Sequence, residues 1–203
     1  MFDNLTGPIP PAGPDGNAII KAVRSAFTSY FEEQHPGEAQ LTFLGSSPLK
    51  LLRFGPDTDR VVTYATLGCS AEAMQDPSAM VVDTTSGPRA ELVLPIRGGL
   101  DEVVRPLGIL AASPSIEGLV LTDGALIDFG QPLWNQSRFT GFVLTTADIP
   151  AVSAEGTEVT IFQPVPATTN EFALARAKGV DELQRVWREQ GVDFTDPHRT
   201  SAV

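Results

Sequence analysis

Two apolar stretches, residues 61–67 and 91–96, restrict this chain to folds that are built around a sheet. Both are rich in residue types that are enriched in strands, and both are apolar enough to lie at the centre of a sheet. The segment between them is rich in Asp, Ser, Thr and Gly and shows no periodicity. We therefore expect two central strands, with Gly68 ending the first and an irregular loop leading to the second.

The helices are signalled by caps and by proline. Asn17 can cap a first helix, in which apolar residues recur at steps of three and four. A second helix is expected to begin just before Pro106, because proline is tolerated in the first turn of a helix. Thr168 and Glu171 have the spacing of a capping box at the start of a third helix. Residues 181–190 predict a last helix.

Turn signals separate the remaining strands. Asp123 and Gly124 predict a hairpin between residues 119–121 and 125–127. Strands and helices that do not alternate regularly indicate an α+β fold, with a mostly antiparallel or mixed sheet and helices packed against it. Four other segments have strand character, namely residues 41–44, 49–54, 140–145 and 157–165.

The length of 203 residues fits one domain with short extensions. We expect an irregular Pro- and Gly-rich arm at residues 1–17, a single domain at 18–195 and a frayed tail at 196–203. Cys69 is the one cysteine, so no disulfide can form within the chain. No signal sequence or membrane-spanning run is evident. These features favour a reducing compartment, and we expect a cytoplasmic protein.

The charge balance restricts the classes of partner. Lys and Arg number 14 against 25 Asp and Glu, which gives a formal net charge of −11. Nucleic acids and anionic membrane surfaces attract the opposite sign of charge, so neither is expected as a partner. An acidic surface is compatible with a basic protein partner, and it also serves solubility.

The sequence contains no catalytic or cofactor motif. It has neither a P-loop nor a dinucleotide-binding fingerprint. One cysteine and two histidines are too few for a structural zinc site, so we expect no metal and no cofactor. Cys69 follows a strand, and we expect a structural thiol there because no base lies nearby in the sequence. No catalytic residue is assigned.

Four residues are candidates for contact with a partner protein: Trp134, Arg138, Glu91 and Asp83. Glu91 is unusual because it lies inside an apolar strand. It can point to solvent, form an ion pair with an arginine such as Arg89 or Arg138, join a hydrogen-bonded network, or take part in recognition. Trp134 lies in a loop, where it is either an exposed anchor of an interface or a residue packed at the edge of the core.

Several stretches, taken in order, resemble the suppressor-of-fused domain family. Residues 64–70 are similar to a strand of that family that ends in a Gly-x-Ser turn, and residues 89–94 are similar to its Glu-Leu strand. The remaining matches are a Leu-x-x-Leu-Ala helix at 107–111, Gly124 with the strand that follows it, residues 131–133, and a late strand and Glu-containing helix at 161–166 and 168–172. The resemblance covers residues 18–192.

The resemblance implies a non-enzymatic protein-binding domain. The larger animal members have a second domain and bind a zinc-finger transcription factor between the two. This chain resembles a stand-alone, bacterial-type member, so that partner is not transferred to it. Stand-alone members are proposed to be immunity or antitoxin-like proteins for toxins. Two features depart from the family: Leu107 follows Pro106 without the tryptophan that members often carry there, and Cys69 replaces a more usual apolar residue.

Three classes of function therefore remain open. A protein-binding domain predicts a surface patch with an aromatic residue such as Trp134. An enzyme of unknown type predicts a pocket that gathers Glu91 with Ser70 or Asp83 and perturbs their pKa values. A homo-oligomeric subunit predicts a large apolar patch on the free surface.

Overall fold

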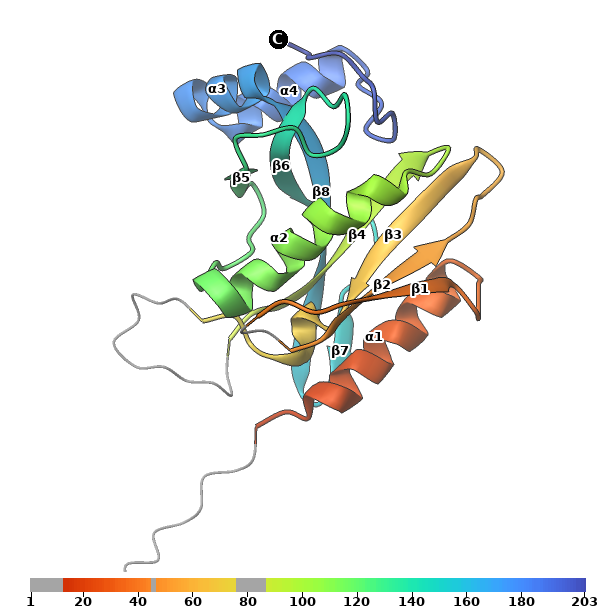
Figure 1. Ribbon diagram of the computed structural model, residues 1–203. Coiled ribbons are helices and arrows are strands. Elements are labelled where there is room, and N and C mark those ends of the chain that lie inside the picture. Colours follow the sequence, from red (N-terminus) through yellow and green to blue (C-terminus); the bar gives the residue numbers. More distant parts are fainter. Residues whose placement is uncertain (1–12, 45–46, 76–86) are drawn as a thin grey trace, which may run out of the picture.

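A computed structural model describes residues 13–44, 47–75 and 87–203 of the chain. It confirms the α+β class, with a mostly antiparallel eight-stranded sheet and helices on both of its faces (Figure 1). In chain order the elements are α1 (Gly16–Tyr30), β1 (Gly37–Leu41), β2 (Leu49–Phe54), β3 (Val61–Leu67), the 3-10 turn η1 (Cys69–Ala71), β4 (Arg89–Arg97), the 3-10 turn η2 (Asp101–Val103), α2 (Val104–Glu117), β5 (Leu126–Asp128), β6 (Phe139–Thr146), β7 (Val152–Ala154), β8 (Thr157–Thr168), α3 (Thr169–Lys178) and α4 (Val180–Glu189).

The two apolar stretches form β3 and β4, and both lie inside the sheet as expected. The strand order is β1–β2–β3–β4–β8–β6–β5, and β7 pairs with β8. β4 and β8 run parallel, whereas the other pairs of described strands run antiparallel. β1 is therefore an edge strand that pairs with β2 on one side.

Each face of the sheet is covered by a helix, because successive strand residues point to opposite faces. α1 buries Ile19, Val23 and Phe27 against one face. α2 buries Leu107 and Leu110 against the other, together with Tyr64, Leu92 and Leu94. α3 and α4 cover the ends of β6 and β8 in a third cluster, which contains Val143, Val165, Phe172, Leu183 and Trp187.

The structure confirms the sequence signals for the start of α2 and α3, and it corrects the one for α1. Pro106 lies in the first turn of α2, and Thr168 and Glu171 form the capping box of α3. The cap of α1 is Asp15 rather than Asn17, because the Asp15 carboxylate accepts a hydrogen bond from the Asn17 N–H. The helix consequently begins at Gly16, within the segment expected to be an irregular arm.

The predicted hairpin at Asp123 and Gly124 is wrong in its first strand. The chain does turn there, but residues 119–121 form no strand. Gly124 N–H donates to the Leu144 carbonyl at 2.8 Å, and Leu144 N–H donates to the Ala125 carbonyl at 2.9 Å. The backbone groups of Gly124 and Ala125 thus pair with β6 and not with residues 119–121. β6 is also the strand that pairs with β5.

The expectation of a frayed tail at 196–203 is also wrong. Arg199 and Ala202 are only 8% and 6% exposed. Arg199 forms an ion pair with Glu171, which is fully buried, so this segment is packed on the domain. The boundaries at residues 17 and 195 otherwise remain predictions, and residues 1–12 lie outside the described part of the chain.

We predict that Gly141→Ala lowers the free energy of unfolding by about 1–3 kcal/mol through overpacking. A Cβ at Gly141 would clash with the Ile127 carbonyl oxygen and would lie 2.7 Å from the Asp128 Cα, both in the backbone of β5. Backbone cannot yield as a flexible side chain can. Urea denaturation measures the change, and Gly37→Ala is the control because its Cβ would meet Arg53 at an ordinary 3.6 Å. Equal stabilities of the two variants would contradict the prediction.

Candidate functional site

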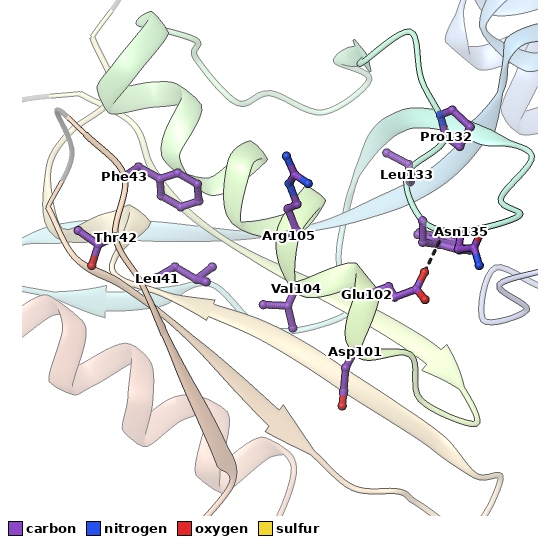
Figure 2. Close-up of a pocket in the computed structure, with 11 residues that line it drawn as sticks. Leu41, Thr42, Phe43, Asp101, Glu102, Val104, Arg105, Pro132, Leu133 and Asn135 are labelled. Carbon is purple, nitrogen blue, oxygen red and sulfur yellow. Dashed lines mark hydrogen bonds between the residues drawn. The ribbon is translucent and has the colours of Figure 1, made fainter.

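A groove of about 740 Å³ opens where the end of β1, the start of α2 and the loop between β5 and β6 meet (Figure 2). Its floor and walls are mostly apolar, and charged side chains lie at its mouth. The residues that line it are Leu41, Thr42, Phe43, Asp101, Glu102, Val104, Arg105, Pro132, Leu133, Trp134 and Asn135.

One wall is positioned by a glycine in α2. A Cβ at Gly108 would clash with the Leu41 side chain and would lie 3.3 Å from the Phe43 ring. The absence of a side chain at Gly108 therefore allows the segment after β1 to pack closely on α2. This approach places Leu41 and Phe43 beside Val104 in the groove.

Hydrogen bonds hold the other parts of the rim. The buried Tyr64 hydroxyl donates to the Asp101 carboxylate at 3.0 Å and accepts the Leu100 N–H at 2.9 Å. Burial, reinforced by Asp101, raises the pKa of Tyr64. The Asn135 N–H donates to the Glu102 carboxylate at 2.8 Å, which joins the 132–135 loop to the start of α2 (Figure 2).

The chemistry of this groove suits the binding of apolar groups. An apolar depression with a few polar groups at its rim buries apolar side chains and orients what carries them. Asp101, Glu102 and Arg105 are exposed at the mouth. Within the described part of the chain, no group of three or more His, Cys, Asp or Glu residues could hold a metal ion.

Trp134 is part of the groove, but it is not the exposed anchor that one interpretation of the sequence predicted. Its side chain is 5% exposed and contacts Phe139 edge-on, with ring centroids 5.6 Å apart. The alternative, packing at the edge of the core, is correct. Arg138 is exposed and does not line the groove. Asp83 lies outside the described residues.

Glu91 belongs to a buried hydrogen-bonded network, one of the alternatives that its sequence position allowed. It is fully buried. Its carboxylate accepts hydrogen bonds from the hydroxyls of Thr66 and Ser70, both at 2.6 Å, and from the N–H groups of Gly68 at 2.8 Å and Ser70 at 3.0 Å. Arg89 instead donates to the Ser70 and Ala71 carbonyls, both at 2.8 Å. A direct contact between Glu91 and a partner would require this network to open.

Cys69 is a structural thiol, as expected, because it is only 7% exposed. Burial, together with the charge of Glu91, raises the pKa of Cys69 well above its usual range. The thiol therefore stays protonated at neutral pH, and a protonated thiol is a poor nucleophile.

Sequence reasoning missed most of the groove. Phe43, Val104 and Leu133 have the same apolar character as ordinary core residues. No local signal marks them as neighbours, since they lie on three separate segments of the chain. They form the lining of a groove only because these three segments meet at the start of α2.

Comparison with known protein families shows to which family this chain belongs. A family model described as "Suppressor of fused protein (SUFU)" matches residues 45–200, which is most of the sequence. The chain belongs to the suppressor of fused family. A comparison with curated proteins finds no match for this SUFU-type domain.

Solved structures show the same SUFU fold. A SUFU homologue from Neisseria gonorrhoeae FA 1090 is 20% identical, with a TM-score of 0.65 over 90% of this chain and 96% of that chain. A chain of the Sufu–Fu complex is 14% identical, with a TM-score of 0.66 over 93% and 92% of the two chains. Drosophila Suppressor of Fused is 15% identical, with a TM-score of 0.66 over 94% of this chain and 52% of that longer chain.

The structure also explains why two of the SUFU-like sequence stretches occur together. The Gly-x-Ser turn after β3 presents Gly68 and Ser70 to the carboxylate of Glu91 in the Glu-Leu strand β4. Gly68 has a φ of 126°, a left-handed value that favours glycine. The two motifs are thus the two halves of one buried network.

Among the described residues, no helix combines the length and the apolar character that crossing a membrane requires.

Proposed function

We propose that this SUFU-type domain binds another protein by receiving an extended apolar segment of that partner in the groove at the start of α2. The observation that carries the proposal is the apolar lining of a groove whose rim is held in place by hydrogen bonds. A rim that is already ordered loses little conformational entropy on binding. The Sufu–Fu complex, in which a protein of the same fold is found with Fu, supports protein binding as the function.

The partner segment is expected to carry basic residues beside its apolar ones. Asp101 and Glu102 are both exposed at the mouth of the groove, and the whole chain has a net charge of −11. Long-range attraction of this kind raises the rate of association with a basic protein and makes that rate dependent on salt. Arg105 at the same mouth favours a segment in which an acidic or polar residue follows the basic ones.

More specifically, we propose that the partner is a toxin and that the domain acts as an immunity or antitoxin-like protein. The negative charge supports it, because a basic toxin is the kind of protein that an acidic inhibitor attracts. Co-expression tests it: the domain should restore growth of cells that produce a captured partner whose expression alone inhibits growth. Growth that stays inhibited, although the two proteins co-purify, would leave binding intact and remove the immunity role.

We predict that Val104→Gln or Phe43→Ser weakens binding of the captured partner by about tenfold or more. A tenfold loss is about 1.4 kcal/mol, and losses of this size are concentrated in the few residues at the packed centre of an interface. The partner is identified by pull-down from the native extract with mass spectrometry, and its affinity for each purified variant is then measured by calorimetry. Ile116→Gln is the matched control, because Ile116 is a 47% exposed apolar residue of the same helix that lies outside the groove.

Unchanged affinity in both groove variants, with thermal unfolding showing them folded, would contradict the docking site. Recovery of the protein alone, together with a concentration-dependent mass in solution, would instead support a homo-oligomer.

A further inference from the structure

A second site, separate from the groove, is built around the carboxylate of Glu171. This side chain is fully buried in the first turn of α3. It accepts hydrogen bonds from the Thr168 N–H at 2.8 Å and from the Trp187 indole N–H at 2.9 Å. Both donors belong to the folded body of the domain, so they fix the orientation of the carboxylate.

One guanidinium group contacts both oxygens of this carboxylate. Arg199 donates to one carboxylate oxygen of Glu171 at 2.7 Å and to the other at 3.1 Å. It also donates to the Pro166 carbonyl at 2.6 Å. Its guanidinium carbon lies 4.8 Å from the centre of the Phe139 ring and 5.8 Å from that of Trp187. A fork of two hydrogen bonds between aromatic rings is the environment that selects arginine over lysine.

The segment that carries this guanidinium is held mainly at this site. Ala202 N–H donates to Glu171 at 3.2 Å, and the Ser201 and Thr168 hydroxyls are 2.8 Å apart. The Gln190 amide donates to the Ala202 carbonyl at 2.7 Å. By contrast, the side chains of His198 and Thr200 are exposed. The segment therefore has the form of a short peptide bound through one arginine.

We propose that Glu171, the Pro166 carbonyl and the rings of Phe139 and Trp187 form a guanidinium-binding site, which residues 196–203 occupy in cis and which an arginine-bearing segment of a partner protein can occupy in their place. None of these site residues lines the groove at the start of α2. The two sites can thus fail or succeed independently. An acidic domain that attracts basic partners brings arginine-bearing segments to this surface.

The experiment uses the full chain with Arg199→Ala, which leaves the site without its guanidinium. The probe is a synthetic peptide with the sequence of residues 196–203, and its control is the same peptide with lysine in place of arginine. We expect the arginine peptide to raise the unfolding midpoint by several degrees at saturation, because a ligand of the folded state stabilises it. Its affinity should be at least tenfold higher than that of the lysine peptide. The double variant Glu171→Gln, Arg199→Ala should show no such response.

The proposal is overturned if the folded Arg199→Ala protein binds neither peptide, or binds both equally well. Hydrogen exchange of the unaltered chain provides a second test that does not depend on the variant folding. The Ala202 amide should exchange through local opening, at least 100-fold faster than the amides of β8. Exchange of Ala202 as slow as that of β8 would show that the segment does not detach, which would also overturn the proposal.

Discussion

Replacing Arg199 with alanine is expected to lower the free energy of unfolding by about 3–5 kcal/mol, the cost of removing one partner of a buried ion pair. The other partner, Glu171, is fully buried and would keep its charge without a compensating cation. The variant also loses the hydrogen bond to the Pro166 carbonyl and the contact with the Phe139 ring. Denaturation in urea at pH 7 measures the loss.

Arg176→Ala is the matched control for this variant. Arg176 also forms an ion pair, with Asp128 at 3.0 Å, and also lies over an aromatic ring, that of Phe172. Its side chain is 55% exposed, however, so solvent screens the pair and its loss should cost at most about 1 kcal/mol. A cost for Arg199→Ala no greater than that of Arg176→Ala would contradict the importance of the buried pair.

The pH dependence of stability should change sign in the same variant. In the intact protein, burial raises the pKa of Glu171, but the hydrogen bonds from Arg199 and the Thr168 N–H outweigh it and hold the pKa below the ordinary value of 4.5. The unfolded chain then binds more protons, so this contribution is present above pH 4.5 and is lost as the pH falls through the folded pKa. Without Arg199, burial dominates and raises the pKa, so stability should fall as the pH rises. Glu171→Gln should remove this contribution to the pH dependence of stability, both in the intact protein and in the Arg199→Ala variant.

Replacing Glu91 with alanine is expected to cost about 4 kcal/mol or more, because four buried donors lose their acceptor at once and each unsatisfied group costs about 1–3 kcal/mol. These donors are the Thr66 and Ser70 hydroxyls and the N–H groups of Gly68 and Ser70. Losing these hydrogen bonds weakens the attachment of the turn after β3 to β4, which Arg89 also holds. Thermal and urea unfolding measure the effect.

Glu91→Gln separates charge from shape at this position. The amide retains one acceptor oxygen for the Gly68 and Ser70 groups, but it places an NH2 donor beside the Thr66 hydroxyl, which can then no longer donate to this side chain. The charge-assisted bonds are also lost, so we expect a loss of about 1–3 kcal/mol. The exposed Glu158 of β8 provides the control, and Glu158→Gln should change stability by less than about 0.5 kcal/mol. At a temperature where the Glu91→Gln protein is folded, it should bind the partner of the groove with unchanged affinity. Weaker binding in that folded variant would restore Glu91 as a recognition residue.

Local signals in the sequence were sufficient for the elements whose formation depends on neighbouring residues. Strand-forming residues placed β3 and β4, Pro106 placed the first turn of α2, and Thr168 with Glu171 placed the cap of α3. These signals act within a few residues, so they can be recognised without knowing the rest of the fold. The family resemblance, confirmed over residues 45–200, supplied the overall architecture.

The tertiary structure alone decided which distant groups meet. Glu91 could have paired with Arg89 or Arg138, but β3 and the turn at Gly68 together bring four donors to its carboxylate. The end of the chain has the composition of a frayed tail, yet Glu171, 28 residues away, makes a buried partner for Arg199. The groove likewise exists only where three segments converge. A buried polar group takes whichever partner the fold brings within reach, and that choice depends on packing between residues far apart in the sequence.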